Sequence, residues 1–134
     1  MINIAICLST KDRTELSEQA IQPLLQPDLY DLWVTDGSTT DEGKAWPFKH
    51  HKGHTPLKII ENVRGGADAA IVHNLTHMLS FPHYDYVGLV ENDVLLDPDW
   101  FDPTMALFFY DRSNIKDYAN CLPVGAVSAR SYED

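Results

Sequence analysis

The stretch YDYVGLVEND, residues 84–93, joins the most apolar strand-like run of the chain to a group of acidic side chains. Residues 84–90 predict a strand of a parallel sheet that is buried on both faces. Such a strand has no structural use for carboxylates at its exit, because burying an unpaired charge is costly. In parallel α/β sheets, ligands bind in the crevice beyond the carboxyl ends of the strands. Glu91 and Asp93 therefore predict a metal or ligand site at that edge.

The apolar pattern on either side of this stretch predicts alternating strands and helices. Besides 84–90, strands are expected at residues 2–8, 29–35, 57–60 and 122–127. The spacing predicts a first helix whose buried face carries Leu16, Ala20, Ile21, Leu24 and Leu25. It predicts a second whose buried face carries Ala67, Ala70, Ile71, Asn74, Leu75, Met78 and Leu79. This order predicts an α/β fold, a Rossmann-like three-layer α/β/α arrangement with a mainly parallel sheet.

The helix boundaries are predicted from capping and breaking residues. Asp12 followed by Glu15 predicts an N-terminal arrangement like a capping box at the start of the first helix, and Pro23 should end that helix early. Residues 42–56 have no clear period and predict a surface loop that could contain a turn of helix. A third helix is expected to begin near Asp97 or Asp99.

Composition limits the class of protein. The chain has 134 residues, 44% of them hydrophobic and 22% charged, which predicts one globular domain over residues 1–134. A formal net charge of −10 disfavours nucleic acid as a partner. No apolar run is long enough for a membrane span, and a strand rather than a signal peptide follows Met1, so a cytoplasmic location is expected. Cys7 and Cys121 are expected to be buried free thiols.

Polar residues follow each predicted strand at the same end. Ser9 and Thr10 follow the first strand, Asp36 the second, and Asn62 the third. Each of these residues also suits an ordinary turn or loop. As a set with the acidic pair after residues 84–90, they predict one ligand site at the carboxyl edge of the sheet.

Four short motifs carry these residues in a fixed order. They are STKDR (9–13), TDGSTTD (35–41), NVRGG (62–66) ahead of a helix with His73-Asn74, and END (91–93) followed by Pro98-Asp99-Trp100. Together they resemble the nucleotide-sugar-binding half of the family 2 glycosyltransferases, which has the GT-A fold, over nearly the whole chain. The chain departs from that family at three positions. Thr35 stands for the first Asp of the base-binding pair, His73 for an Arg, and Glu91 for the first Asp of the Asp-x-Asp metal motif.

The resemblance implies a site for a nucleotide-diphosphate sugar, with a uridine nucleotide favoured. The residues it implies for the nucleotide are Ser9, Thr10, Arg13, Asp36, Asn62, Gly66 and Asn92. Asp36 takes the position that accepts a hydrogen bond from the base. The resemblance also implies Mn²⁺ or Mg²⁺, held by Asp93 with help from Glu91, since such cations bind carboxylate and phosphate oxygens together. The activity expected is inverting transfer of the sugar to an acceptor hydroxyl, for example on a saccharide.

Family members place the carboxylate base for this reaction in a later, acceptor-binding half, and the chain is expected to be truncated before it. Glu133 and Asp134 resemble the base motif in letters only, because they follow residues 122–127 almost at once. No catalytic residue is therefore assigned. The chain should expose apolar surface and form a homodimer.

Two other classes stay open. A non-catalytic nucleotide-binding or regulatory α/β module, such as a receiver-type domain, would need acidic residues after the first strand and a phosphoacceptor Asp after the third, where the chain has STKD and EN. A nucleotidyltransferase would need a glycine-rich basic loop after the first strand, and residues 9–13 contain no glycine.

Overall fold

The structure is a computed structural model that describes residues 2–51, 57–61 and 67–108. The chain divides into two compact units, residues 1–95 and 96–134, which are described separately. The single-domain organisation expected from the length stays a prediction. Among the described residues, no helix has the length and apolar character needed to cross a membrane.

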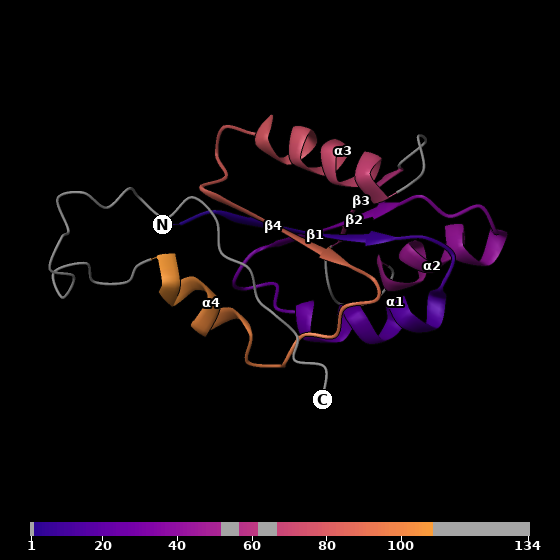
Figure 1. Cartoon of the computed structure of the whole chain (residues 1–134), viewed down its shortest axis with the longest axis horizontal. Helices are drawn as coiled ribbons and strands as arrows, with labels where there is room; N and C mark the ends of the chain where they lie inside the picture. Colours follow the sequence, from indigo (N-terminus) through magenta and orange to yellow (C-terminus); the bar gives the residue numbers. More distant parts are fainter. Residues whose placement is uncertain (1, 52–56, 62–66, 109–134) are drawn as a thin grey trace, which may run out of the picture. The chain divides into compact units, whose positions relative to one another are not determined.

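A four-stranded parallel sheet forms the centre of the first unit (Figure 1). Its strands are β1 (Ile4–Thr10), β2 (Asp31–Asp36), β3 (Leu57–Glu61) and β4 (Tyr86–Glu91), in the spatial order β3-β2-β1-β4. The register pairs Thr10 with Asp36 and Ser9 with Glu91, so all the expected site residues of these strands lie at one edge. The predicted parallel, Rossmann-like sheet is confirmed.

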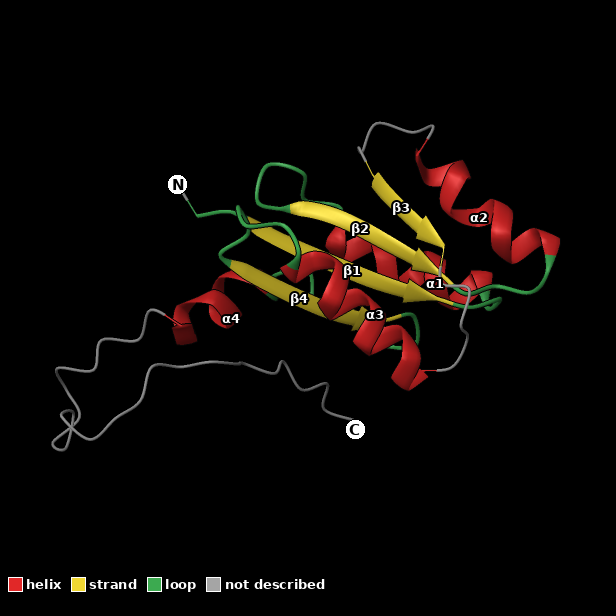
Figure 2. Ribbon diagram, turned by 90° about the horizontal axis from the view of Figure 1, so that it is seen from above, coloured by secondary structure: helices red, strands yellow, loops and turns green. Residues whose placement is uncertain are grey.

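Helices cover both faces of the sheet and make three layers (Figure 2). The helix α3 (Ala67–Leu79) lies on one face. The helices α1 (Thr14–Ile21) and α2 (Asp41–His51) lie on the other. A short 3₁₀ turn, Gln22–Leu24, follows α1, and so Pro23 ends this helix as expected. The three-layer α/β/α prediction is confirmed.

The core on the α3 side of the sheet is built from Ala5, Cys7, Trp33 and Met78. Strand residues of the opposite parity face α1, where Ala20, Ile21 and Leu24 are buried. Cys7 is a buried free thiol, as expected. Cys121 and the predicted strand 122–127 lie outside the described residues.

Residues 42–56 were expected to form a loop with at most a turn of helix, and this is wrong for the part that belongs to α2, which is 11 residues long. Thr40 caps this helix, because its Oγ1 accepts a hydrogen bond from the Gly43 N–H at 3.1 Å. Trp46 and Pro47 are buried on its inner side. The helix contains Pro47, a residue that usually breaks helices, and therefore the sequence pattern suggested a loop.

The buried faces of α1 and α3 also differ from expectation. Leu16 is 36% exposed, while Ser17 is buried in its place. On α3 the polar Asn74 is buried, because it bonds to the end of β1, and Ile71, Leu75 and Leu79 face outward. The predicted face of α3 is therefore right at Asn74 and Met78, which are both buried, and wrong at Ile71, Leu75 and Leu79.

The strand β4 is not buried on both faces as expected. Within the sheet of described strands it lies at an edge, and Leu89 is 36% exposed. Its Gly88 lies against Ile6, with space too small for a Cβ unless the Ile6 side chain moves.

The described part of the second unit is a turn followed by α4 (Phe101–Phe108). This helix begins later than expected, because Asp97 accepts hydrogen bonds from the N–H groups of Asp99 and Trp100 and closes a turn there. The Trp100 and Phe101 rings meet edge to face at 5.5 Å between centroids.

Candidate functional site

The carboxyl ends of β1 and β4 lie side by side where the strand order reverses. The first two crossovers run from β1 outward to β2 and β3, and the third returns past β1 to place β4 on its other side. In open α/β sheets, ligands bind outside the strand ends at such a reversal. The candidate site is this edge, with Ser9, Thr10, Asp36 and Glu91 on three of its strands.

Asp36 is held at the end of β2 by three hydrogen bonds to one carboxylate oxygen. Its Oδ1 accepts from Thr10 Oγ1 at 3.0 Å, from the Ser38 N–H at 3.2 Å, and from Ser38 Oγ at 2.6 Å. The side chain is 8% exposed. No described donor reaches Oδ2. Asp36 is therefore a fixed acceptor with one oxygen left for a ligand.

Asp12 joins the loop after β1 to the loop after β2. Its carboxylate accepts from the backbone N–H groups of Thr39 and Thr40, both at 2.8 Å, and from their two hydroxyls, both at 2.9 Å. Its own N–H donates to Ser38 Oγ at 2.8 Å. The capping-box-like start predicted for α1 is wrong. Arg13 is the N-cap residue and makes no side-chain capping bond, while Asp12 bonds to the residues that lead into α2.

These bonds favour the ionised carboxylate of Asp12. The N–H of Thr40 contributes most, and the pKa of Asp12 is held well below its usual range. Asp12 has a backbone φ of 56°, in the left-handed region that Asn, Asp and Gly tolerate best. The loop thus depends on both the side chain and the backbone conformation of this residue.

Ser9 and Asn92, two of the expected nucleotide-binding residues, are bonded to helices. Ser9 Oγ accepts from Asn74 Nδ2 of α3 at 2.7 Å. Asn92 Nδ2 donates to Ser17 Oγ of α1 at 3.0 Å. Both side chains therefore anchor helices at the carboxyl edge of the sheet, and their contact with a nucleotide stays a prediction.

The remaining expected residues divide into exposed and undescribed ones. Arg13, Glu91 and Asp93 are exposed at this edge, and Glu91 accepts the Val94 N–H in a turn that carries Asp93. Asn62 and Gly66 lie outside the described residues. No group of three or more His, Cys, Asp or Glu side chains that could hold a metal alone occurs in the described ranges.

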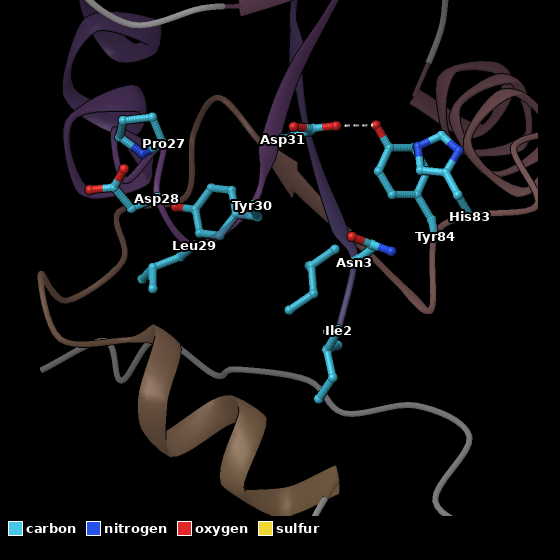
Figure 3. A pocket seen from close by; sticks show the side chains of 10 residues that line it. Ile2, Asn3, Pro27, Asp28, Leu29, Tyr30, Asp31, His83 and Tyr84 are labelled. Carbon is cyan, nitrogen blue, oxygen red and sulfur yellow. Dashed lines mark hydrogen bonds between the residues drawn. The ribbon is translucent and has the colours of Figure 1, made fainter.

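A cavity lies at the opposite edge of the sheet, away from the candidate site. It has a volume of about 320 Å³ and is lined by Asn3, Leu29, Tyr30, His83 and other residues (Figure 3). Since it adjoins the amino ends of β1 and β2, it is no part of the candidate site.

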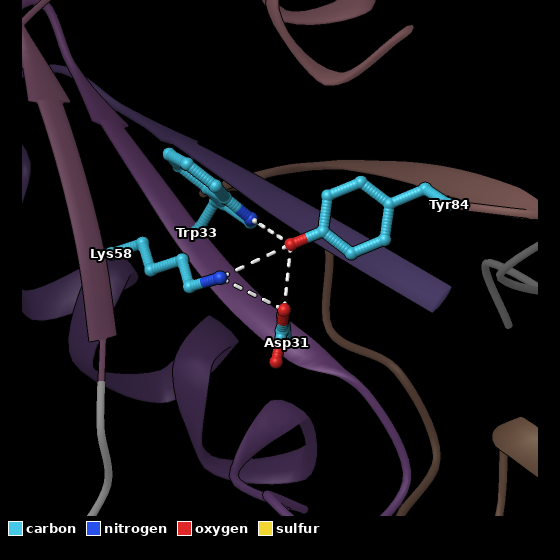
Figure 4. A network of polar contacts seen from close by, with 4 residues as sticks. All are labelled: Asp31, Trp33, Lys58 and Tyr84. Atoms are coloured by element: carbon cyan, nitrogen blue, oxygen red, sulfur yellow. Dashed lines mark hydrogen bonds and ion pairs between the residues drawn. The ribbon is translucent and has the colours of Figure 1, made fainter. Parts of the chain in front are cut away.

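Beside that cavity, the Tyr84 hydroxyl is the centre of a polar network (Figure 4). It donates to Asp31 at 2.6 Å and accepts from Trp33 Nε1 and Lys58 Nζ, each at 3.2 Å. Lys58 also pairs with Asp31 at 2.9 Å. The hydrogen bond from Tyr84 is the main cause that lowers the pKa of Asp31. This network ties β2, β3 and the loop before β4 together.

Sequence reasoning missed Asp12, Ser38, Thr39 and Thr40 as one connected group. A signal was present, because Thr40-Asp41-Glu42 has the composition of a helix start, where side-chain acceptors are needed for backbone N–H groups. The partner, 27 residues earlier, could not be inferred from local spacing.

Comparison with known proteins identifies the fold. No protein-family model matches the chain, and no curated protein matches it significantly. Among solved structures, the chain resembles the mannosyltransferase PcManGT from Pyrobaculum calidifontis in complex with GDP-Man and Mn²⁺, with a TM-score of 0.57 and 21% identity. The match covers 76% of this chain and 33% of that one.

A second solved structure, TarS of S. aureus, matches with a TM-score of 0.61 and 12% identity over 81% of this chain and 20% of that one. The chain thus spans a third or less of the length of these two proteins. Both matches bear out the resemblance found in the motifs. The chain has the Rossmann-like α/β fold of glycosyltransferases.

Proposed function

We propose that the carboxyl edge of this sheet binds a nucleotide-diphosphate sugar for a glycosyltransferase reaction. The observation that carries the proposal is Asp36, a nearly buried carboxylate fixed through Oδ1 by Thr10 and Ser38. It lies one strand from the reversal point, on a fold that the chain shares with glycosyltransferases. A fixed carboxylate oxygen with no described partner at such an edge is suited to a ligand that donates a hydrogen bond.

The free oxygen of Asp36 favours particular bases. Uracil at N3 and guanine at N1 carry an N–H on the Watson–Crick edge, whereas cytosine N3 and adenine N1 accept hydrogen bonds. An ionised carboxylate only accepts, so it can pair with the ring N–H of the first two bases. Beside cytosine or adenine it would meet a lone pair at the ring nitrogen, and only their exocyclic amino groups could donate to it. Uridine and guanosine nucleotides are both compatible with this site, and GDP-Man is the ligand of one similar structure.

A divalent cation suits the donor set at the end of β4. Glu91 and Asp93 are exposed oxygen ligands two residues apart, and an ion that needs six oxygens would take others from the diphosphate and water. Mn²⁺ or Mg²⁺ bound by Asp93, with Glu91 assisting, would stabilise the charge that develops on the diphosphate as it leaves. Arg13 is exposed three residues after the end of β1, and its cationic side chain would help to neutralise a phosphate at this edge.

Inverting transfer to an acceptor hydroxyl needs in addition a carboxylate base. None of the described carboxylates is assigned that role. The isolated chain is therefore expected to bind a donor nucleotide without transferring sugar.

A matched set of nucleotides tests the base contact. Calorimetry with UDP and CDP in the presence of Mn²⁺ should show UDP bound about tenfold or more tightly, since an unsatisfied polar group costs about 1–3 kcal/mol. In Asp36→Asn the amide oxygen would keep the Thr10 and Ser38 bonds, and the NH₂ would replace the free oxygen. This variant should reverse the preference towards CDP. Equal affinities of both nucleotides for both proteins would refute the base contact.

The metal is tested separately. The quantity measured is the ratio of the UDP affinity with Mn²⁺ to the UDP affinity without it. In Asp93→Asn this ratio should be lower than in the wild type by about tenfold or more. Asp28→Asn removes the same charge from an exposed site at the opposite edge and serves as the control. If Asp93→Asn and Asp28→Asn show the same Mn²⁺ dependence, Asp93 holds no metal.

A further inference from the structure

We propose that Asp12 is the positioning residue that sets base selectivity at this site. It acts by holding the loop after β2 in the one arrangement that fixes the Asp36 carboxylate. This inference rests on the proposed nucleotide binding, and it adds a residue that makes no contact with the base itself.

A continuous chain of hydrogen bonds joins Asp12 to Asp36. The Asp12 N–H donates to Ser38 Oγ at 2.8 Å, and Ser38 Oγ donates to Asp36 Oδ1 at 2.6 Å. The same hydroxyl therefore links the loop after β1 to the carboxylate after β2. Any movement of the Asp12 backbone changes the position of a group that orients Asp36.

The carboxylate of Asp12 holds the other side of that loop. It accepts four hydrogen bonds from Thr39 and Thr40, two from backbone N–H groups and two from hydroxyls. Ser38 lies between these residues and Asp36, so the segment is fixed at both ends. Gly43 of α2 packs so closely on this junction that a Cβ would lie 2.6 Å from Ser38 Oγ and 2.9 Å from Asp12 Oδ1. Little free volume remains for the loop to take another arrangement.

The competing explanation is that Asp12 only stabilises the fold by supplying acceptors ahead of α2. That role predicts a change in stability with an unchanged ratio of affinities for different bases. A positioning role predicts a change in the ratio, because the ratio depends on where the Asp36 oxygen lies and not on how stable the domain is.

Two substitutions at Asp12 separate these explanations at equal charge. Both Asn and Gly tolerate a φ of 56°, and both remove the negative charge. Asn keeps an oxygen for the N–H groups of Thr39 and Thr40, and its NH₂ can donate to the Thr39 hydroxyl. Gly keeps none of these bonds. The Asp12→Asn variant is the conservative rescue, and Asp12→Gly is the test.

The experiment measures UDP and CDP affinities by calorimetry with Mn²⁺, for the full chain and each variant. The ratio of the two affinities should be about tenfold or more in the wild type, stay within about threefold of that value in Asp12→Asn, and fall close to one in Asp12→Gly. The Ser38→Ala variant removes the linking hydroxyl and should also lower the ratio. It gives the answer independently if Asp12→Gly does not fold, as judged by circular dichroism.

The outcomes distinguish this inference from the proposed function. A wild type that binds UDP about tenfold more tightly than CDP, with the same ratio in Asp12→Gly or Ser38→Ala, overturns the positioning role and leaves nucleotide binding intact. A wild type that binds neither nucleotide, or both equally, overturns the proposed base site and with it the role of Asp12. A lowered ratio in Asp12→Asn as great as in Asp12→Gly would also contradict the inference, since the bonds to Thr39 and Thr40 would then be irrelevant.

Discussion

Replacing Gly43 by alanine should destabilise the protein, although the same change inside a helix usually stabilises. A glycine costs roughly 0.5–1 kcal/mol relative to alanine in a helix interior, and α2 would gain that amount. The added Cβ, however, would lie 2.6 Å from Ser38 Oγ and 2.7 Å from Ser38 Cβ. Ser38 is short and bonded on both sides, so it can yield only if its loop moves. Overpacking of this kind costs about 1–3 kcal/mol.

Moving Ser38 would also weaken its hydrogen bond to the ionised Asp36, and bonds to charged groups contribute about 1.5–3 kcal/mol. The steric and hydrogen-bond costs outweigh the helix gain, so we expect a net loss of about 1–2 kcal/mol in the free energy of unfolding.

Urea denaturation of Gly43→Ala measures this loss. The matched control is Ala45→Gly, an exposed position of the same helix, which should cost about 1 kcal/mol through propensity alone. A Gly43→Ala protein as stable as the wild type, beside an Ala45→Gly protein that shows its expected loss, would refute the close contact between α2 and the Ser38 loop.

Three further predictions concern other parts of the first unit. Tyr84→Phe should lower the free energy of unfolding by about 1–2 kcal/mol, because Asp31 and Trp33 lose a common hydrogen-bond partner. In the same urea titration, Lys58→Gln should cost less than about 1 kcal/mol, because it removes an exposed ion pair. Burial raises the pKa of the Cys7 thiol from 9.0 to about 11, so the stability that the neutral thiol contributes is complete below pH 9.0 and is lost as the pH rises towards 11. The free energy of unfolding, measured across that range in a Cys121→Ser background, should therefore fall more steeply with pH when Cys7 is present than when it is replaced in Cys7→Ala. The outward face of α3, where Val72 is 65% and Leu79 is 67% exposed, should cause self-association at micromolar concentration. Light scattering measures this, and a monomeric wild type would contradict the prediction. A Val72→Lys and Leu79→Lys double variant that associates as strongly as the wild type would contradict it too.

The sheet could be predicted from the sequence because each strand has a strong local pattern. Four apolar runs, each ending in polar residues, were enough to place β1 to β4 and to bring Thr10, Asp36 and Glu91 to one edge. Parallel strands joined by helices admit few other arrangements. The motifs also led to the glycosyltransferase fold.

The helices were harder to predict because their buried faces depend on contacts from distant segments. Ser17 is buried where Leu16 was expected, and its hydroxyl accepts a hydrogen bond from Asn92, 75 residues later in the chain. The α2 helix forms across Pro47 because Thr40 caps it by accepting the Gly43 N–H, and Asp12 holds the N–H of Thr40 in turn. Trp46 also packs inward, and its Nε1 donates to Glu18 of α1. Local propensity carries neither kind of information, and tertiary contacts override it.

The two groups of carboxylates at this edge differ in the way that their proposed roles require. Asp12 and Asp36 each accept three or more hydrogen bonds, so they keep their position without a ligand. Glu91 and Asp93 are exposed, and no described donor reaches their carboxylates. A carboxylate held in place by several donors is less able to turn towards a cation, whereas one surrounded by water can exchange water for metal. This difference suits the roles proposed for Asp36 at the base and Asp93 at the metal, because the loops after β1 and β2 hold Asp12 and one oxygen of Asp36, whereas no described donor holds Glu91 or Asp93.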